Sequence, residues 1–496
     1  MNVFQEFQQL NIEKKAFING KYVEAVSGAT FEKVLSYNGE TILSGITRCE
    51  KEDIDIAVDA ALDAYTSRIW CDKSPTVKKK VLLRLALLME EHRRELALLD
   101  AYETGRAFRN YYEDSIPKAI DAVRYFAESV DKLYDSAVPA RERDAAIIKR
   151  VSLGVVGLIT PWNDPMVVTC WKLAPALLMG NSVVLKPAEQ SSLSAIRLAG
   201  LAKEAGMPDG VFNVVPGYGE IAGEALALHP KVRGISFTGS CFVGKKILQY
   251  AGQSNMKRVT LECGGKGPYI VTDKCRNIKR AAQVLSENMF YNQGQICSAP
   301  SRVLIHQSVM NEFMDELKKE SRRFIPGDTF DSENVVGCVV SKEQYEKVQH
   351  YIDDAKKNGN KVWQCDEKKV HPEHAFCIPP TIITNVNPLD PIAREEVFGP
   401  VVTVIPIKTT EEAVQIANES EYGLAGAVWS DDLNEAYMVS NAVEVGLMHI
   451  NSYGNDDNSA PFGGVKQSGV GKDKSVYAFD DFSDKKTIWM HIEYPR

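Results

Sequence analysis

The chain has 496 residues, of which 44% are hydrophobic and 25% are charged, and its formal net charge is −8. This length exceeds what one hydrophobic core usually serves, so we expect an ordinary globular protein with two or more domains. Both signs of charge are spread along the chain, and no apolar run approaches the roughly 18 residues that span a bilayer, so the sequence argues against nucleic acid or membrane as main partners.

The N-terminal stretch, residues 1–20, has no basic segment followed by an apolar run, so we expect no signal peptide. The ten cysteines are scattered and none forms a C-x-x-C pair, so the sequence suggests neither a zinc centre nor a dithiol pair, and we expect no metal. These features predict a cytoplasmic protein with reduced thiols, in which a single cysteine is most often a small core residue.

Residues 151–272 alternate between strand-like and helix-like patterns. The expected strands are 151–160, 182–187, 210–217, 234–239 and 258–262, and the expected helices are 191–205, 220–228 and 243–251. Regular alternation predicts right-handed βαβ units and a parallel, doubly wound sheet, hence an α/β fold. Such sheets bind ligands at the carboxyl ends of their strands.

A second α/β block is predicted from about residue 265 to residue 472. Its clearest elements are helices at 278–289 and 343–357 and strands at 400–407 and 446–450. Outside the two blocks lie two strand-like pieces, residues 132–150 and the tail 480–496. They predict either an oligomer contact through edge pairing or a simple surface hairpin.

Two groups at predicted strand ends suit a nucleotide. Ser240 follows the strand "GISFTG" and precedes a helix, so the turn either holds a phosphate on free backbone N–H groups or uses Ser240 as an N-cap. Lys186 and Glu189 follow another strand, where a carboxylate can accept from ribose hydroxyls or form a solvated charge pair. The segment 217–223 misses the G-x-G-x-x-G spacing and is interpreted as a tight turn.

Three further groups suggest covalent chemistry. Asn163 lies between two prolines and offers a rigid amide as an oxyanion donor, although a turn asparagine is commoner. Glu262 ends an apolar strand, where a carboxyl tends to have a raised pKa and can act as a general base, or is simply salt-bridged or solvated. Cys297 follows a helix in a Gln/Gly-rich loop. A thiol, an amide, a carboxylate and a phosphate-type turn together describe oxidation through a thioester.

With these motifs in order, the sequence resembles the aldehyde dehydrogenase superfamily over nearly its whole length. The motifs that carry the resemblance are "TPWNDP", "GNSVVLKPAE", "FTGS", "LECGGK", "NQGQICSAPSR", "EEVFGPV", "YGLAGAVWS" and "PFGGVKQSGVGKD". Within that superfamily the chain is most similar to the bacterial branch that oxidises γ-glutamyl-γ-aminobutyraldehyde and 4-guanidinobutyraldehyde.

The resemblance implies catalytic roles for four residues. Cys297 is the expected nucleophile, and the Asn163 side chain with the Cys297 backbone N–H is expected to hold the oxyanion. Glu262 is expected to activate the water that hydrolyses the thioester, and Lys172 matches a lysine that supports the site. A non-enzymatic structural protein on the same scaffold is the rival reading, but it would need none of the first three groups.

The resemblance also implies an NAD site. Lys186 and Glu189 match contacts to the adenosine ribose, and Glu189 favours NAD over NADP because a 2′-phosphate would meet a carboxylate. The other expected cofactor contacts are Trp162, Gly239, Ser240, Gly264, Glu396 and Phe398.

The implied domains are an NAD-binding domain (1–133 and 151–263), a catalytic domain (264–472) and an oligomerisation element (134–150 and 473–496), the last predicting a homodimer or homotetramer.

Some positions depart from the family pattern and bear on the substrate. An aromatic residue is usual where Asp164 stands, and Lys118 falls on a helix flanking the aldehyde entrance. A cationic substrate could pair with Asp164, a carboxylate-bearing semialdehyde with Lys118, or the two residues with each other around a small hydrophilic aldehyde. Cys241, Phe242, Cys263 and Pro300 also depart from the pattern. The remaining expected substrate contacts are Trp171, Ile296, Ser298 and Phe462.

Overall fold

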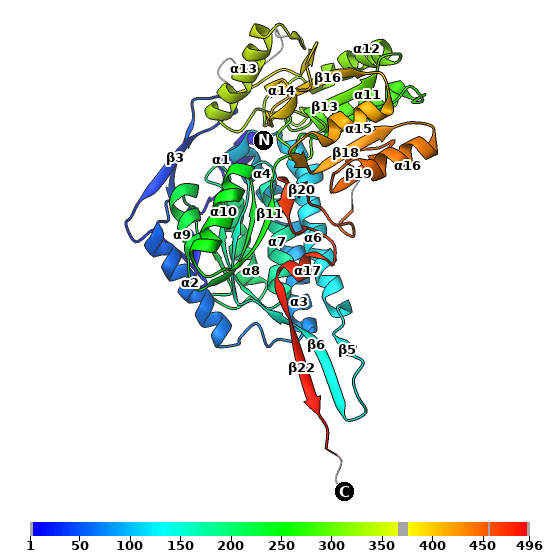
Figure 1. The fold of residues 1–496 in the computed structure, drawn as a ribbon. Helices are drawn as coiled ribbons and strands as arrows, with labels where there is room; N and C mark the ends of the chain where they lie inside the picture. The colour runs from blue at the N-terminus through cyan, green and yellow to red at the C-terminus, as the bar shows by residue number, and fades with distance from the viewer. Residues whose placement is uncertain (1–2, 366–374, 455–456, 494–496) are drawn as a thin grey trace.

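The computed structural model describes residues 3–365, 375–454 and 457–493 (Figure 1). Two open sheets, each covered by helices, form the body, and a thin antiparallel arm projects from it. Helices and strands alternate along most of the chain, which confirms the α/β class. None of the helices in the described ranges has the length and apolar content needed to cross a bilayer.

The first sheet has a parallel centre with short antiparallel strands at its edges. Its strand order is β2-β1-β9-β8-β7-β10-β11-β21. The strands are β2 (Lys21–Val23), β1 (Ala16–Ile18), β9 (Phe212–Val214), β8 (Ser182–Lys186), β7 (Val155–Ile159), β10 (Val232–Thr238), β11 (Arg258–Glu262) and β21 (Gly469–Val470). Strands β7 and β8 are buried along their whole length, as expected for parallel strands covered on both faces.

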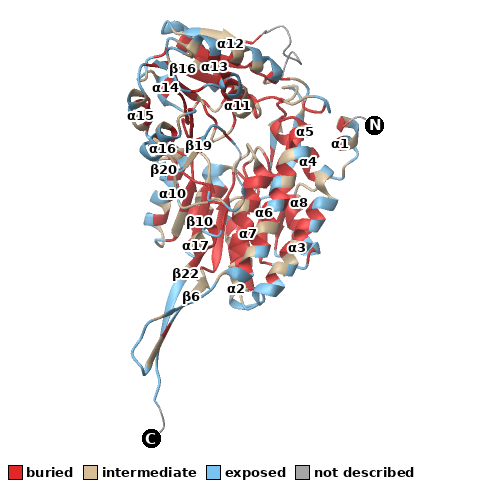
Figure 2. Ribbon diagram, turned by 90° about the vertical axis from the view of Figure 1, so that its right-hand side faces the viewer, coloured by how far each residue is buried: buried red, intermediate tan, exposed pale blue. Residues whose placement is uncertain are grey.

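Alternate residues of these central strands enter two different cores. Val156 of β7 and Val183 of β8 lie in one apolar cluster, and their neighbours Val155 and Val184 lie in another. Helices α3 (Pro75–Glu91), α4 (Arg93–Thr104), α6 (Ile116–Ser129), α7 (Pro165–Leu178) and α8 (Leu193–Glu204) contribute to the first cluster. Helices α2 (Lys51–Thr66), α9 (Glu224–Leu228) and α10 (Cys241–Gln253) contribute to the second, so helices cover both faces (Figure 2).

The second sheet carries the other α/β block. Its order is β14-β15-β16-β13-β12-β18-β19, with β14 antiparallel and the rest parallel. The strands are β14 (Lys361–Gln364), β15 (Thr381–Thr384), β16 (Val401–Ile407), β13 (Arg302–His306), β12 (Pro268–Val271), β18 (Ala425–Trp429) and β19 (Leu447–Ile450). Helices α11 (Ile278–Phe290), α12 (Met310–Ser321), α13 (Lys342–Lys357), α15 (Thr410–Asn418) and α16 (Leu433–Ala442) flank it.

The predicted strand at 151–160 is wrong at its start. Residues up to Ser152 belong to β6 (Asp144–Ser152), which lies in a separate three-stranded sheet. Gly154 has a φ of +117°, a conformation that side-chain-bearing residues rarely adopt, so the chain turns there before β7 begins. The predicted helix at 220–228 also starts differently, with a π-helical turn at Gly219–Gly223 ahead of α9.

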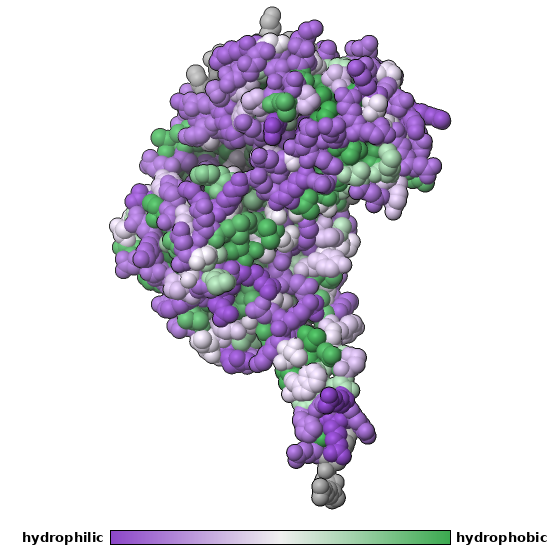
Figure 3. Space-filling view, in the orientation of Figure 1, coloured by the Kyte–Doolittle hydropathy of each residue, from purple (hydrophilic) through white to green (hydrophobic). Residues whose placement is uncertain are grey.

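The arm consists of β5 (Ser136–Val138), β6 and β22 (Ser483–His491). Strand β22 pairs antiparallel with β6 from Ser483↔Ser152 to His491↔Asp144, so the two strand-like pieces predicted outside the main blocks pair with each other. The arm leaves apolar side chains in the open, among them Ile488, Trp489 and Met490, and Figure 3 shows green and pale residues along its upper part. Whether this surface pairs with another copy, and the proposed domain boundaries, stay predictions.

Candidate active site

A cavity of about 200 Å³ lies at the carboxyl ends of β10 and β11, facing the second α/β block. Many of the predicted residues line it together: Trp162, Asn163, Gly239, Ser240, Glu262, Gly264, Cys297, Glu396 and Phe398. The groups from the first block meet here because β7, β10 and β11 end at the same edge of the first sheet, and Cys297, Glu396 and Phe398 come from the second block.

Cys297 lies in what we call the cysteine loop, residues 291–299, which follows the end of α11 at Phe290. Gln293 and Gly294 both have positive φ. A Cβ at position 294 would also overlap the carbonyl oxygen of Gly399, so residue 294 must be glycine. Burial, followed by the carboxyl groups of Glu262 and Glu396, raises the pKa of the Cys297 thiol to about 12. The thiol is therefore protonated at neutral pH and needs a proton acceptor before it can attack.

Side-chain amides hold the cysteine loop in place. Gln293 Nε2 donates to the carbonyl of Ile378 at 2.8 Å, and the Ile378 N–H donates back to Gln293 Oε1 at 3.2 Å. Gln295 Oε1 accepts from the Val340 N–H at 2.9 Å. The side-chain amides of Gln293 and Gln295 thus provide the hydrogen bonds that backbone pairing would provide if the loop were a strand.

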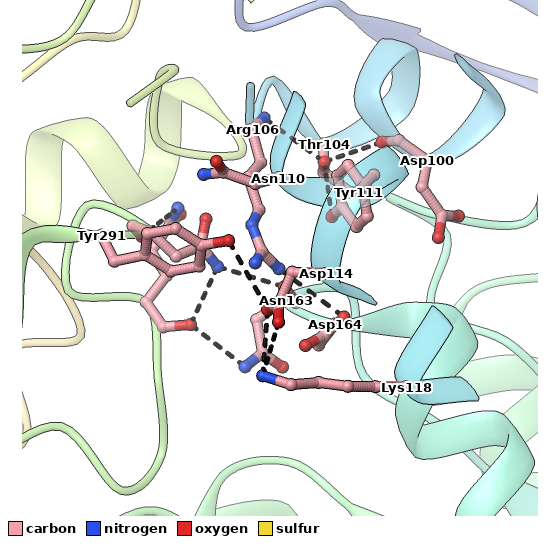
Figure 4. Close-up of polar contacts among 12 residues, drawn as sticks. Asp100, Thr104, Arg106, Asn110, Tyr111, Asp114, Lys118, Asn163, Asp164 and Tyr291 are labelled. Carbon is pink, nitrogen blue, oxygen red and sulfur yellow. Dashed lines mark hydrogen bonds and ion pairs between the residues drawn. The ribbon is translucent and has the colours of Figure 1, made fainter. Parts of the chain in front are cut away.

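Asn163 is fixed beside the cysteine loop. Its Nδ2 donates to the carbonyl of Gln295 at 3.0 Å, and Asn292 Nδ2 donates to the Asn163 carbonyl at 3.1 Å (Figure 4). An amide NH₂ group carries two N–H donors, so one remains for an oxygen in the cavity. This arrangement suits an oxyanion donor.

Glu262 ends β11 and its carboxyl is buried. Burial first and the neighbouring Asp473 second raise its pKa well above the ordinary value, while the ammonium groups of Lys172 and Lys472 act in the opposite direction. The carboxyl lies against Gly463, where a Cβ would overlap Oε1. A carboxyl with a raised pKa next to a thiol can serve as a general base.

Lys172 does not line the cavity. It is buried on α7 and its Nζ forms an ion pair with Asp473 Oδ2 at 2.8 Å, so its influence on the cavity passes through Glu262 and Asp473.

The predicted cofactor residues fall into two places. Ser240 is the N-cap of α10, accepting from the Val243 N–H at 3.3 Å, and with Gly239 it faces the cavity. Lys186 and Glu189 form a 3.2 Å ion pair with each other, so the predicted charge pair is present, but they are not among the residues lining this cavity.

The other end of the cavity is shaped by Glu396 and Phe398. Glu396 Oε1 accepts from the Gly265 N–H at 3.1 Å, and a Cβ on Gly264 would overlap the same carboxyl, which explains the glycine at position 264. The rings of Phe398 and Trp162 pack edge to face with centroids 5.4 Å apart.

Five residues that line the cavity were not among the predicted site residues: Pro161, Thr238, Cys263, Gln344 and Lys347. Thr238 could have been found, because it belongs to the "FTGS" motif. Gln344 gave no local signal. It lies in the first turn of α13 and reaches back to donate to the Phe398 carbonyl at 2.8 Å, which fixes a residue whose φ is +56°.

The predicted substrate residues lie apart from this lining. Trp171 and Phe462 pack with ring centroids 5.4 Å apart. The Ser298 carbonyl accepts a 2.6 Å hydrogen bond from the Tyr453 hydroxyl. Ile296 packs against the apolar core of the second block, which leaves less of its side chain for a substrate.

Asp164 and Lys118 each form their ion pair with another residue, although the Lys118 ammonium still lowers the pKa of the Asp164 carboxyl. Lys118 Nζ lies 2.9 Å from Asp114 Oδ1, one helical turn away, and Asp164 Oδ1 lies 3.6 Å from Arg106 Nη1 (Figure 4). We call Arg106, Asp114, Lys118 and Asp164 the charged cluster.

Comparison with known proteins identifies the fold and the family. The aldehyde dehydrogenase family matches residues 22–488. The chain is 43% identical to the NADP/NAD-dependent aldehyde dehydrogenase PuuC of Escherichia coli, over 98% of this chain and 97% of that protein. It is 40% identical to the aminoacetaldehyde dehydrogenase of Pseudomonas aeruginosa, over 97% and 96% of the two chains.

Two solved structures support the same conclusion. A γ-glutamyl-γ-aminobutyraldehyde dehydrogenase from Burkholderia cenocepacia superposes with a TM-score of 0.95 at 40% identity, over 99% of this chain and 100% of that one. An indole-3-acetaldehyde dehydrogenase in complex with NAD⁺ gives 0.96 at 40% identity, over 99% of each chain. These matches confirm the resemblance seen in the motifs and the expected fold. The chain belongs to the aldehyde dehydrogenase family.

Proposed function

We propose that the protein uses NAD to oxidise a short polar or charged aldehyde, of the ω-amino or γ-glutamylamino type, to its carboxylic acid. The observation that carries this proposal is the single cavity onto which Cys297, Asn163 and Glu262 open beside the Ser240 turn. A non-enzymatic protein on this scaffold would have no use for a nucleophile, an oxyanion donor and a base on one cavity.

The residues present fit NAD. The Ser240 turn offers backbone N–H groups at the start of α10 to a pyrophosphate, and Thr238 Oγ1 is buried there without a hydrogen-bond partner among the described residues. Glu396 and Phe398 stand where they can hold the nicotinamide half. The Glu189 carboxylate favours NAD over NADP, although the similar E. coli enzyme is named for both cofactors.

In the proposed reaction Cys297 Sγ attacks the aldehyde carbon and the Asn163 N–H holds the resulting oxyanion. The thiol proton needs an acceptor, and Glu262, with its raised pKa, lines the same cavity. When bound, NAD supplies the hydride acceptor that makes the thioester possible. After releasing the thiol proton to solvent, Glu262 takes a proton from the water that attacks the thioester and passes it to the departing Cys297 sulfur, so the carboxylic acid and the free thiol are formed.

Two substrate classes are supported by different groups of the charged cluster. Asp164 supports a cationic aldehyde, and two similar proteins are named for aminoacetaldehyde and for γ-glutamyl-γ-aminobutyraldehyde. Lys118, with a side chain that is 60% exposed, supports the alternative of a carboxylate-bearing semialdehyde, such as succinic or malic semialdehyde.

A substrate panel tests the function directly. NADH formation at 340 nm is measured with amino-, carboxyl- and alkyl-aldehydes for the unchanged protein, Asp164→Asn and Lys118→Met. We expect the amino-aldehydes to have the highest kcat/KM and Asp164→Asn to remove that preference. NAD binding without turnover of any aldehyde would contradict the proposed function, and a preference left intact by both variants would contradict the charged substrate site.

We also propose that the arm joins copies of the chain into a homodimer or homotetramer. Its apolar side chains include Trp489, which is 60% exposed in the single chain. Light scattering of the unchanged protein and of Trp489→Lys measures the assembly. We expect the variant to dissociate more readily, and a monomeric unchanged protein would contradict the proposal.

A further inference from the structure

Arg106 is a buried cation next to the proposed active site. It follows Gly105, whose φ of +76° ends α4, and its side chain is only 4% exposed. The guanidinium carbon lies 4.9 Å from the ring centroid of Tyr111 and 5.0 Å from that of Tyr291, so two rings hold it (Figure 4). A buried charge held in this way needs a counter-ion.

That counter-ion is Asp164. Its Oδ1 lies 3.6 Å from Arg106 Nη1, and this buried atom has no hydrogen-bond partner among the described residues. The Asp164 side chain as a whole is 28% exposed, in contrast to Arg106. One oxygen therefore faces the arginine, while part of the Asp164 side chain stays exposed.

The second cation of the charged cluster is engaged elsewhere. Lys118 Nζ lies 2.9 Å from Asp114 Oδ1, and the Tyr291 hydroxyl also donates to Asp114, at 3.5 Å. Lys118 therefore has a carboxylate partner of its own, and Arg106 is the cation of the cluster that forms its ion pair with Asp164.

We infer that Arg106 is a positioning residue that keeps Asp164 ionised and oriented beside Asn163, so that Asp164 binds the ammonium group of a short ω-aminoaldehyde. The inference rests on the proposed function and deepens it by selecting one substrate class. Arg106 itself is too deeply buried to meet a substrate carboxylate. Its role is specificity, and it acts through Asp164.

The electrostatics agree with this role. Burial raises the pKa of Asp164, and Arg106 opposes that rise most strongly, followed by Lys118. The titratable or charged groups that face Asp164 are Arg106, Lys118, Asp114, Asp100 and Tyr111. Removing the guanidinium must raise the pKa of Asp164 further. As the pH falls, the Asp164 carboxylate of such a variant therefore becomes protonated at a higher pH than in the unchanged protein.

The experiment compares two aldehydes of nearly equal size, 3-aminopropanal and butanal. The ratio of their kcat/KM values is measured from pH 6 to pH 9 for the unchanged protein, Arg106→Met and Arg106→Lys. A matched control is Arg109→Met, because Arg109 is a nearby exposed cation that pairs with Glu113 and not with Asp164.

We expect Arg106→Met to lose about tenfold or more of the preference for 3-aminopropanal at pH 7, mainly through KM, as when a hydrogen bond to a charged group is lost. The remaining preference should appear only at higher pH than in the unchanged protein. Arg106→Lys should restore the preference, and Arg109→Met should leave it unchanged.

Other outcomes would overturn the inference. In the first, Arg106→Met keeps the ratio of the two kcat/KM values and its dependence on pH. In the second, Arg106→Lys oxidises butanal but does not regain the preference for 3-aminopropanal. Loss of the preference in Arg109→Met would also count against it. If the unchanged protein oxidises neither aldehyde, nor any other of the panel, the proposed function itself fails, and the two failures are thereby distinguished.

Discussion

The buried ion pair behind Glu262 gives the sharpest test of how the site is supported. Lys172 Nζ lies 2.8 Å from Asp473 Oδ2 and 3.1 Å from Oδ1, and Lys172 is 1% exposed. At an effective dielectric constant of 20, two unit charges at 2.8 Å attract by about 6 kcal/mol, before the desolvation of both groups is subtracted. Lys172→Met keeps the side-chain length but leaves the Asp473 carboxylate buried and unpaired, which should cost about 3–5 kcal/mol of stability.

The double variant Lys172→Met/Asp473→Leu supplies the control. Replacing both members of a buried pair by apolar groups is often nearly neutral, so it should recover most of the lost stability. The measurement is the denaturant midpoint followed by tryptophan fluorescence. If Lys172→Met shifts the free energy of unfolding by less than about 1 kcal/mol, or if the double variant is no better than the single one, the buried pair is not what stabilises this region.

The same variants should move the pH dependence of turnover. Lys172 lowers the pKa of Glu262, so its removal raises that pKa further above the ordinary value. Glu262 must be deprotonated to act as a base, so the acidic limb of kcat should shift to higher pH in Lys172→Met. Asp473 raises the same pKa by more than Lys172 lowers it, so the double variant should return the limb to or below its original position. A shift to lower pH in the single variant would refute this reasoning.

Three further predictions concern the catalytic groups. Cys297→Ser should abolish NADH formation while NAD binding, measured by calorimetry, persists. Gly463→Ala should displace the Glu262 carboxyl, because the new Cβ would overlap Oε1, and mass spectrometry should show acyl-enzyme accumulating as hydrolysis slows. Position 294 requires a positive φ, and the Cβ added by Gly294→Ala would overlap the Gly399 carbonyl oxygen. We therefore expect kcat to fall about a hundredfold or more, equivalent to ~3 kcal/mol of activation free energy.

Much of the cavity was predictable because strand ends are easy to find. Asn163, Ser240 and Glu262 follow three strands of one parallel sheet, and the carboxyl ends of parallel strands share an edge. Cys297 comes from the other α/β block. No local pattern places it opposite Glu262, so its position depended on the family resemblance, and the structure brings the two onto one cavity.

Contacts between side chains from distant segments could not be predicted from the sequence. Asp473 gave no sign that it would pair with Lys172, and Arg106 gave none that it would reach Asp164, because such contacts follow from packing and not from spacing. The partner of Lys118 was different. Asp114 stands four residues before it, a spacing at which helical side chains meet, so that ion pair could have been recognised.

The electrostatics of the cavity link its nucleophile to its base. Glu262 and Glu396 both raise the pKa of the Cys297 thiol, and burial raises the pKa of both carboxyls as well. The loss of a proton from any one of these three groups therefore makes the loss of a proton from the others less favourable. The ligand-free site favours the protonated, neutral forms of the thiol and the carboxyls. A proton that leaves the thiol for Glu262 removes one of the two carboxylates that oppose the thiolate, so transfer between these two groups adds no net negative charge to the cavity. The carboxyl that we propose as the base for thioester hydrolysis is, once ionised, also the group best suited to accept the thiol proton, because the same burial that suppresses a free thiolate makes the Glu262 carboxylate a stronger proton acceptor.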